Sequence, residues 1–209
     1  MDFQATLFDA NPGLARRSVH GDLNDLTRTL LSHGAWIDVR RNWFVGADEA
    51  FATLIREAPW REESRQMYDR VVKVPRLVAM YAGHETLPHP ALTEAREALS
   101  AHYLPELGER FETAGCCFYR NGSDSVAWHG DTIGRGKTDD TMVAIVSLGD
   151  PRKLLLRPRE AGPSLAFILG HGDLLVMGGS CQRTWEHSVP KIAHAGPRIS
   201  VQFRPHNVF

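Results

Sequence analysis

The residues best suited to chemistry in this sequence are two histidines and an aspartate, His129, Asp131 and His187. Residues i and i+2 of an extended chain point to the same side, so an HxD pair on a strand presents an imidazole and a carboxylate together. A second imidazole from a distant strand completes the two-histidine, one-carboxylate set that binds non-haem Fe(II) and leaves coordination positions open. The sequence therefore predicts a mononuclear iron site.

The triplet HGD occurs twice, at 129–131 and at 171–173, so one copy has to be chosen. The second copy leads directly into the apolar run LLVMGG, which favours a tight turn before a buried strand. It also lies only 16 residues before His187, counted from position 171, which leaves room for little more than one hairpin. The first copy lies 58 residues before His187, counted from position 129, and several strands fit between them. We therefore assign the metal pair to the first copy.

The segment 198–204, RISVQFR, alternates apolar and polar residues, so it predicts a strand with one face of each kind. If the polar face lines a cavity, Arg198 and Arg204 need anions, because an unpaired buried charge is too costly to keep. A dicarboxylate would satisfy both, since guanidinium binds carboxylate through paired hydrogen bonds.

The chain as a whole has 209 residues, of which 43% are apolar and 23% charged, as in an ordinary single globular domain. No apolar run approaches the roughly 20 residues that span a bilayer, and we expect no membrane partner. The start of the sequence does not read as a secretory signal, and three cysteines build no disulfide framework, so we expect a cytoplasmic protein.

The net charge of −1 excludes a protein that grips nucleic acid with its whole surface. A local basic strip could still do so, although we prefer to interpret these residues as a solvated face. The strip would consist of Arg135, Lys137, Arg152, Lys153, Arg157 and Arg159.

The pattern of elements changes along the chain. Helical spacing of apolar residues predicts helices over 22–33, 47–58 and 91–103, with strands joined by a loop over about 61–83. From residue 116 onward, eight short apolar runs punctuated by Gly, Pro and Asp predict strands, and no helical stretch of ten residues interrupts them. The fold class is mainly β with flanking helices (α+β), a jelly roll buttressed by N-terminal helices.

These motifs together resemble one family. Residues 111–204 are similar to the AlkB-type Fe(II)/2-oxoglutarate dioxygenases, which remove alkyl groups from nucleobases. The matching runs are 117–122 (CFYRNG), 124–131 (DSVAWHGD), 147–152 (SLGDPR), 171–177 (HGDLLVM), 185–190 (WEHSVP) and 197–204 (PRISVQFR). The segment 74–76 (VPR) with Tyr81 resembles the family's nucleotide-recognition region.

The resemblance implies a double-stranded β-helix and a role for each matching residue. Iron would be bound by His129, Asp131 and His187. Arg198 would pair with the distal carboxylate of 2-oxoglutarate, and Tyr119 and Arg204 would help to hold this cosubstrate. Asp131 and Arg204 are the expected catalytic residues, and Arg76, Tyr81 and Trp128 are the candidates to face the substrate.

The sequence also departs from the family's pattern. Cys117 and Ser200 stand where the family usually has asparagines that contact the cosubstrate, so they should contact it more weakly. Thr132 and Ile133 follow the metal pair, where acidic residues that help to read the base are typical. The resemblance therefore supports the binding of iron and 2-oxoglutarate more strongly than it supports a particular substrate.

The resemblance implies one domain over 1–209, in which 1–110 forms a helical buttress with a substrate-recognition lid at about 60–90, and 111–209 forms the catalytic core. It implies oxidative demethylation of N-alkylated bases in DNA or RNA with Fe(II), 2-oxoglutarate and O2, releasing formaldehyde, succinate and CO2. No obligate protein partner is expected. Two alternatives are a 2-oxoglutarate oxygenase acting on RNA, protein or a small molecule, and a non-catalytic β-roll binding module.

Overall fold

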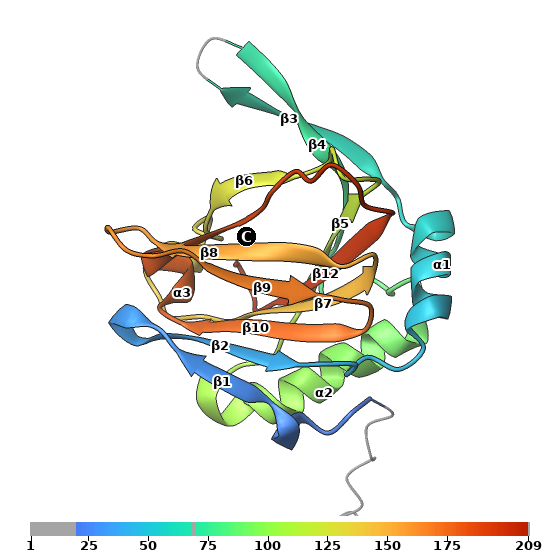
Figure 1. The fold of residues 1–209 in the computed structure, drawn as a ribbon. Helices are drawn as coiled ribbons and strands as arrows, with labels where there is room; N and C mark the ends of the chain where they lie inside the picture. Colours follow the sequence, from blue (N-terminus) through green and yellow to red (C-terminus); the bar gives the residue numbers. More distant parts are fainter. Residues whose placement is uncertain (1–19, 68–69, 209) are drawn as a thin grey trace, which may run out of the picture.

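The computed structural model describes residues 20–67 and 70–208, which form two facing antiparallel sheets with helices against one of them (Figure 1). In spatial order, the larger sheet contains β1 (Thr27–Leu30), β2 (Ala35–Arg40), β10 (Asp173–Gly179), β7 (Val143–Gly149), β12 (Arg198–Arg204), β5 (Thr113–Tyr119), β4 (Arg70–Tyr81) and β3 (Arg61–Met67). The smaller sheet contains β6 (Val126–His129), β11 (Trp185–Val189), β8 (Arg152–Pro158) and β9 (Leu165–Leu169). From β5 onward the chain passes back and forth between the sheets, as in a jelly roll, which confirms the predicted fold class.

The two central strands β7 and β10 explain why their sequences are apolar without a break. Their side chains point alternately to the two faces of the sheet. Val143 and Ile145 of β7 pack between the two sheets, whereas Ala144 and Val146 pack in a second core beneath the helices. Both faces of the larger sheet are therefore buried at these two strands. The smaller sheet covers the core that lies between the two sheets.

The helices α1 (Ala47–Glu57) and α2 (Pro90–Leu107) cover the outer face of the larger sheet, and both were predicted from the sequence. In α1, Ala50 and Leu54 are one turn apart and are fully buried against the sheet. A short helix α3 (Cys181–Thr184) links β10 to β11, and three 3₁₀ turns complete the list: η1 (Leu23–Asp25), η2 (Ser32–Gly34) and η3 (Arg135–Lys137). In the part of the chain that the structure describes, no helix is long and apolar enough to cross a membrane.

The helix predicted over 22–33 is wrong, because this segment forms η1, the edge strand β1 and η2. Strand β1 pairs with β2, and the guanidinium of Arg28 binds Asp38 while lying 3.7 Å from the ring centroid of Trp36. Pairing with an existing sheet thus overrides the helical spacing of the leucines. Residues 1–19 of the expected buttress lie outside the described residues.

The strands predicted over about 61–83 are present as the hairpin β3–β4, which projects from one edge of the larger sheet (Figure 1). Pro75 lies inside β4 and not in the connecting loop. Because four strands of the larger sheet come from the first 110 residues, this part of the chain is less helical than expected. The division into buttress, lid and core stays a prediction.

Candidate functional site

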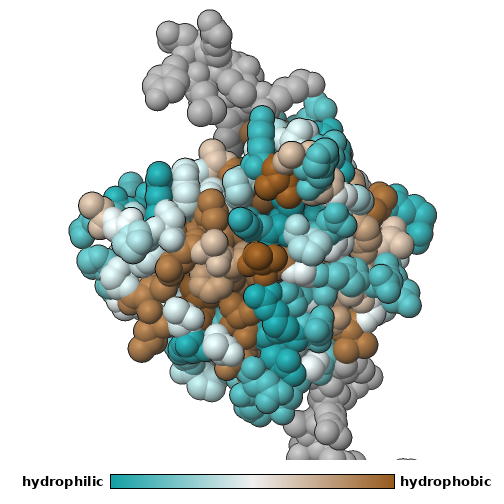
Figure 2. Space-filling view, in the orientation of Figure 1, coloured by the Kyte–Doolittle hydropathy of each residue, from teal (hydrophilic) through white to brown (hydrophobic). Residues whose placement is uncertain are grey.

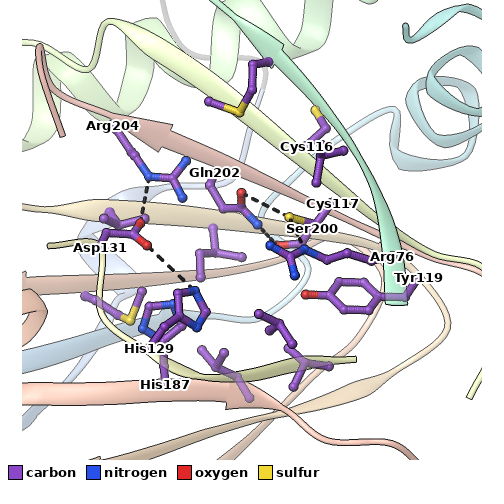
Figure 3. Close-up of a pocket in the computed structure, with 18 of the residues that line it drawn as sticks. Arg76, Cys116, Cys117, Tyr119, His129, Asp131, His187, Ser200, Gln202 and Arg204 are labelled. Carbon is purple, nitrogen blue, oxygen red and sulfur yellow. Dashed lines mark hydrogen bonds and ion pairs between the residues drawn. The ribbon is translucent and has the colours of Figure 1, made fainter. Parts of the chain in front are cut away.

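A cavity of about 270 Å³ lies between the two sheets. Side chains from β4, β5 and β12 of the larger sheet face side chains from β6 and β11 of the smaller sheet across it (Figure 3). All four polar residues of β12 line it, namely Arg198, Ser200, Gln202 and Arg204. The polar face predicted for this strand therefore meets a cavity and not bulk water.

The histidines of the predicted metal site come together because β6 and β11 are neighbours. His129 and His187 are directly opposite each other in the antiparallel pair, and their ring centroids are 4.2 Å apart. Asp131 follows two residues after His129, and its Oδ1 lies 3.9 Å from His129 Nε2. One side-chain donor atom from each of the three residues lies within 4.8 Å of the others, which is close enough for one metal ion.

The protonation states of these residues suit metal binding. Burial and the neighbouring His129 lower the pKa of His187 to about 3, so its imidazole is neutral at pH 7. Nδ1 of His129 lies 2.8 Å from the carbonyl oxygen of Ala127, which fixes Nδ1 as the protonated nitrogen and directs Nε2 toward Asp131. Neutral imidazoles are the form that ligates metals.

Asp131 is buried, yet it is held in its ionised form. Burial alone would raise the pKa of its carboxyl group, but Arg204 and then the two histidines outweigh this effect and lower the pKa below its ordinary value. Arg204 donates a 2.7 Å hydrogen bond from Nε to Asp131 Oδ2 (Figure 3). The backbone N–H of Asp131 donates to Oε1 of Gln182 at 3.0 Å. Gln182 comes from α3, and no pattern in the sequence pointed to it.

Arg198 marks a second, anion-binding part of the cavity. Its side chain is 1% exposed, and Nε donates to Ser147 Oγ at 2.9 Å. Nη1 is buried and has no hydrogen-bond partner among the described residues. Its guanidinium lies 5.3 Å from the ring centroid of Tyr119. Such a group is costly unless an anion pairs with it, so a carboxylate of a small ligand fits this position.

The middle of the cavity carries a connected set of polar groups. Arg76 Nε donates to Cys117 Sγ at 3.3 Å, and Gln202 Nε2 donates to Ser200 Oγ at 2.8 Å. Tyr119 is 2% exposed, and burial raises its pKa to about 12, so it stays a neutral phenol. The structure thus brings the predicted cosubstrate residues and Arg76 together. Gln202 was visible only as one member of the polar face of its strand.

Two residues predicted to face the substrate lie elsewhere. Tyr81 is 7% exposed and packs in the core under the helices, on the face of β4 opposite to the cavity. Trp128 does not line the cavity either, because neighbouring side chains of a strand point to opposite faces and His129 points inward. Its ring lies outside the cavity, and the ring centroid is 4.3 Å from Cζ of Arg157. Both expectations are therefore corrected.

The second HGD triplet forms the turn before β10, as the sequence predicted. The left-handed φ of Gly172, +80°, requires glycine. Asp173 accepts backbone hydrogen bonds from Asn42 and Gly170, and His171 Nδ1 accepts one from Gly149. This triplet holds loops together at a distance from the metal site.

The suggested basic strip does not form an open cationic surface. Arg152 is 1% exposed and donates to the carbonyl oxygens of Asn121, Asp124 and Pro190. The other three arginines of the strip bind carboxylates: Arg157 and Arg159 share Glu186, and Arg135 binds Glu109. The interpretation as a solvated face fits Arg135, Arg157 and Arg159, which are partly exposed, but not the buried Arg152.

Comparisons with known proteins agree with the geometry of the cavity. A family model described as the 2OG-Fe(II) oxygenase superfamily matches residues 78–204. The bovine (Bos taurus) alpha-ketoglutarate-dependent dioxygenase alkB homolog 3 is 32% identical over 182 residues, which cover 76% of this chain and 61% of the relative. The DNA oxidative demethylase ALKBH2 of Arabidopsis thaliana is 31% identical over 191 residues, which cover 74% of this chain and 60% of the relative. The chain thus spans about three fifths of the length of these relatives.

The fold is also found among solved structures. The structure of OsALKBH1 superimposes with a TM-score of 0.59 at 16% sequence identity, and the match covers 86% of this chain and all of the other. At this level of identity the likeness concerns the fold alone.

Proposed function

Because the chain belongs to the 2OG-Fe(II) oxygenase superfamily and is of the AlkB type within it, we propose that it oxidatively demethylates N-alkylated bases in nucleic acid, with release of formaldehyde, succinate and CO2. One observation carries the proposal. A metal-binding set of two histidines and an ionised aspartate shares its cavity with Arg198, a buried cation that lacks an anionic partner among the described residues. Such a cavity suits a metal and a carboxylate ligand together.

His129, Asp131 and His187 would hold Fe(II), which supplies the oxidation of the alkyl carbon with O2 and 2-oxoglutarate as co-reactants. Arg204 keeps Asp131 ionised and fixes the direction of its second oxygen. Arg198 would bind the distal carboxylate of 2-oxoglutarate, and Tyr119, Cys117 and Ser200 would line the cosubstrate between its two ends.

The substrate would enter beside the hairpin β3–β4, since Arg76 and Met80 of β4 line the cavity. A base inside a duplex has to be flipped out of the stack to reach a metal at this depth, whereas a single-stranded base does not. The names of the relatives, a DNA oxidative demethylase and an alkB homolog, support nucleic acid as the class of substrate.

The test is to incubate the protein with Fe(II), 2-oxoglutarate and methylated oligonucleotides, and to measure formaldehyde and succinate together. Single-stranded DNA, duplex DNA and RNA of one sequence should be compared, each with an unmethylated control. We expect formaldehyde only from methylated strands. Succinate without formaldehyde from any of these strands would contradict nucleic-acid demethylation but retain the oxygenase.

A further inference from the structure

We propose that Glu63 of β3 recognises the alkylated base, by accepting a hydrogen bond from an amino group beside the alkylated ring nitrogen. This inference rests on the proposed function and names the residue that would select its substrate. Such an amino group is present in 3-methylcytosine, where it shares the positive charge of the ring. In 3-methyluracil a carbonyl oxygen, which cannot donate a hydrogen bond, takes its place, and the ring is uncharged.

Two buried side-chain atoms of the residues that line the cavity have no hydrogen-bond partner among the described residues, Nη1 of Arg198 and Oε2 of Glu63. They belong to groups of opposite charge, and each is costly unless a ligand pairs with it. Arg198 is assigned to the distal carboxylate of the cosubstrate. The oxygen of Glu63 needs a hydrogen-bond donor, which 2-oxoglutarate does not provide, so a different ligand has to pair with it.

Of the carboxylates in the cavity lining, Glu63 is the one available to a substrate. Among the described residues, the lining contains two, Glu63 and Asp131. Asp131 is assigned to the metal and accepts a 2.7 Å hydrogen bond from Arg204. Glu63 Oε2 lies 3.9 Å from Nη2 of Arg76, which is beyond hydrogen-bond distance, so this oxygen can still accept a hydrogen bond.

The strand register directs Glu63 into the cavity. Glu62 is paired with Leu77 of β4. Arg76 and Val78, on either side of Leu77, line the cavity. Side chains alternate between the two faces of a sheet, so Glu62 points away from the cavity and Glu63 points toward it. The side chain of Glu63 is 40% exposed and that of Arg76 is 8% exposed, so the carboxylate lies at the opening and the guanidinium behind it.

Apolar side chains at the same opening complement this role. Met80 of β4 and Ile133 line the cavity while being 50% and 67% exposed. Exposed apolar groups at an opening gain from covering the face of a ring, but they discriminate weakly between rings of similar shape. The segment 132–137, which follows the metal pair, contains no acidic residue. Recognition of the amino group therefore falls to Glu63.

The closing experiment compares 3-methylcytosine with 3-methyluracil in one single-stranded DNA sequence. Formaldehyde release gives kcat/KM for each base, and fluorescence anisotropy of the protein loaded with Zn(II) and 2-oxoglutarate gives binding without turnover. We expect the wild type to prefer 3-methylcytosine about tenfold in both measurements, because a hydrogen bond between charged groups is stronger than a neutral one.

Glu63→Gln tests the cause, because it keeps the length of the side chain and removes its charge. We expect this variant to lose about tenfold of the preference, so that the two bases become nearly equal, with little change in the binding of 3-methyluracil. Glu62→Gln is the matched control, since it is the same substitution one position earlier, on the face away from the cavity. It should keep the wild-type preference.

The outcomes separate this inference from the proposed function. A preference that is unchanged in Glu63→Gln, or equal losses with both bases, would mean that Glu63 serves only as a counterion of Arg76 and would overturn the inference. Formaldehyde from either base would still support the proposed function. Formaldehyde from neither base would overturn the proposed function, and the inference with it.

Discussion

The triplets 129–131 and 171–173 have the same sequence, His-Gly-Asp, but their side chains face different partners. Asp131 projects into the cavity, where it meets Arg204 and His129. Asp173 is equally buried, but it points at the backbone N–H groups of Asn42 and Gly170. One triplet is surrounded by side chains that suit a metal, and the other by the ends of loops.

The difference teaches that a carboxylate is a candidate metal ligand only when its neighbours leave an oxygen available for the metal. In the first triplet, Oδ2 of Asp131 is held by Arg204, while Oδ1 points toward His129. In the second, both oxygens of Asp173 accept backbone hydrogen bonds, and the side chain also binds Arg41. The surroundings, and not the triplet, decide the chemistry.

The largest expected effect comes from removing one charge in each triplet. Asp131→Asn should abolish activity and weaken binding of Fe(II) or Mn(II) by more than the roughly 10–100-fold that the loss of an outer-sphere partner costs. Asp173→Asn keeps the shape of the side chain, and we expect metal affinity close to the wild type. Equilibrium dialysis with Mn(II) measures both. Loss of metal binding in Asp173→Asn alone would reverse our assignment of the triplets.

The second-largest effect is expected at Arg198, the anion-binding residue in the cavity that contains the first triplet. Arg198→Met should weaken 2-oxoglutarate binding roughly 10–100-fold, because hydrogen bonds to charged groups contribute about 1.5–3 kcal/mol. Metal affinity should change little. The variant without ligand should be no less stable, since an unpaired buried charge is replaced by an apolar chain. Thermal unfolding with and without 2-oxoglutarate separates these effects, and undiminished stabilisation by 2-oxoglutarate would contradict this role of Arg198.

Much of the fold could be predicted because the apolar runs have clear limits. The eight segments after residue 116 are bounded by Gly, Pro or Asp, and each contains a strand. The segment 22–33 was misjudged because spaced leucines fit a helix, while the pairing of β1 with β2 depends on a partner strand that local sequence does not reveal. Long-range pairing is the information that a single segment lacks.

In the site, too, the residues marked by a local sequence pattern could be predicted, whereas those brought in from distant segments could not. Strand periodicity and the resemblance to a family identified the metal triplet and the arginines of β12. Trp128 lies outside the cavity because it is the strand neighbour of the inward-facing His129, and the two side chains point to opposite faces. Gln182 was missed because it supports Asp131 from 51 positions away in the sequence.

The support from Gln182 provides a smaller test, since the N–H of Asp131 donates to a side chain, whereas the N–H of Asp173 donates to the backbone carbonyl of Gly170. Gln182→Leu removes the acceptor of the Asp131 N–H, so the aspartate loses orientation and we expect metal affinity to fall roughly tenfold. Trp128→Leu is the control, because Trp128 lies beside the metal ligand His129 but outside the cavity. Calorimetric titration with Mn(II) measures both variants. Equal losses in the two would mean that general disturbance of the sheet, and not the lost hydrogen bond, weakens the site.

The smallest effect distinguishes the glycines at the centre of the triplets. Gly172→Ala forces alanine into a left-handed φ, which should cost about 1–2 kcal/mol and lower Tm by about 2–8 °C, with metal affinity unchanged. In Gly130→Ala, the new Cβ would lie 2.4 Å from the carbonyl oxygen of Gln182, so the same substitution should displace the support of Asp131 and reduce metal affinity. Unfolding curves and Mn(II) titrations of the two variants test this separation. Because the substitution is identical in identical triplets, only their surroundings explain a loss of stability alone in one and of metal binding in the other.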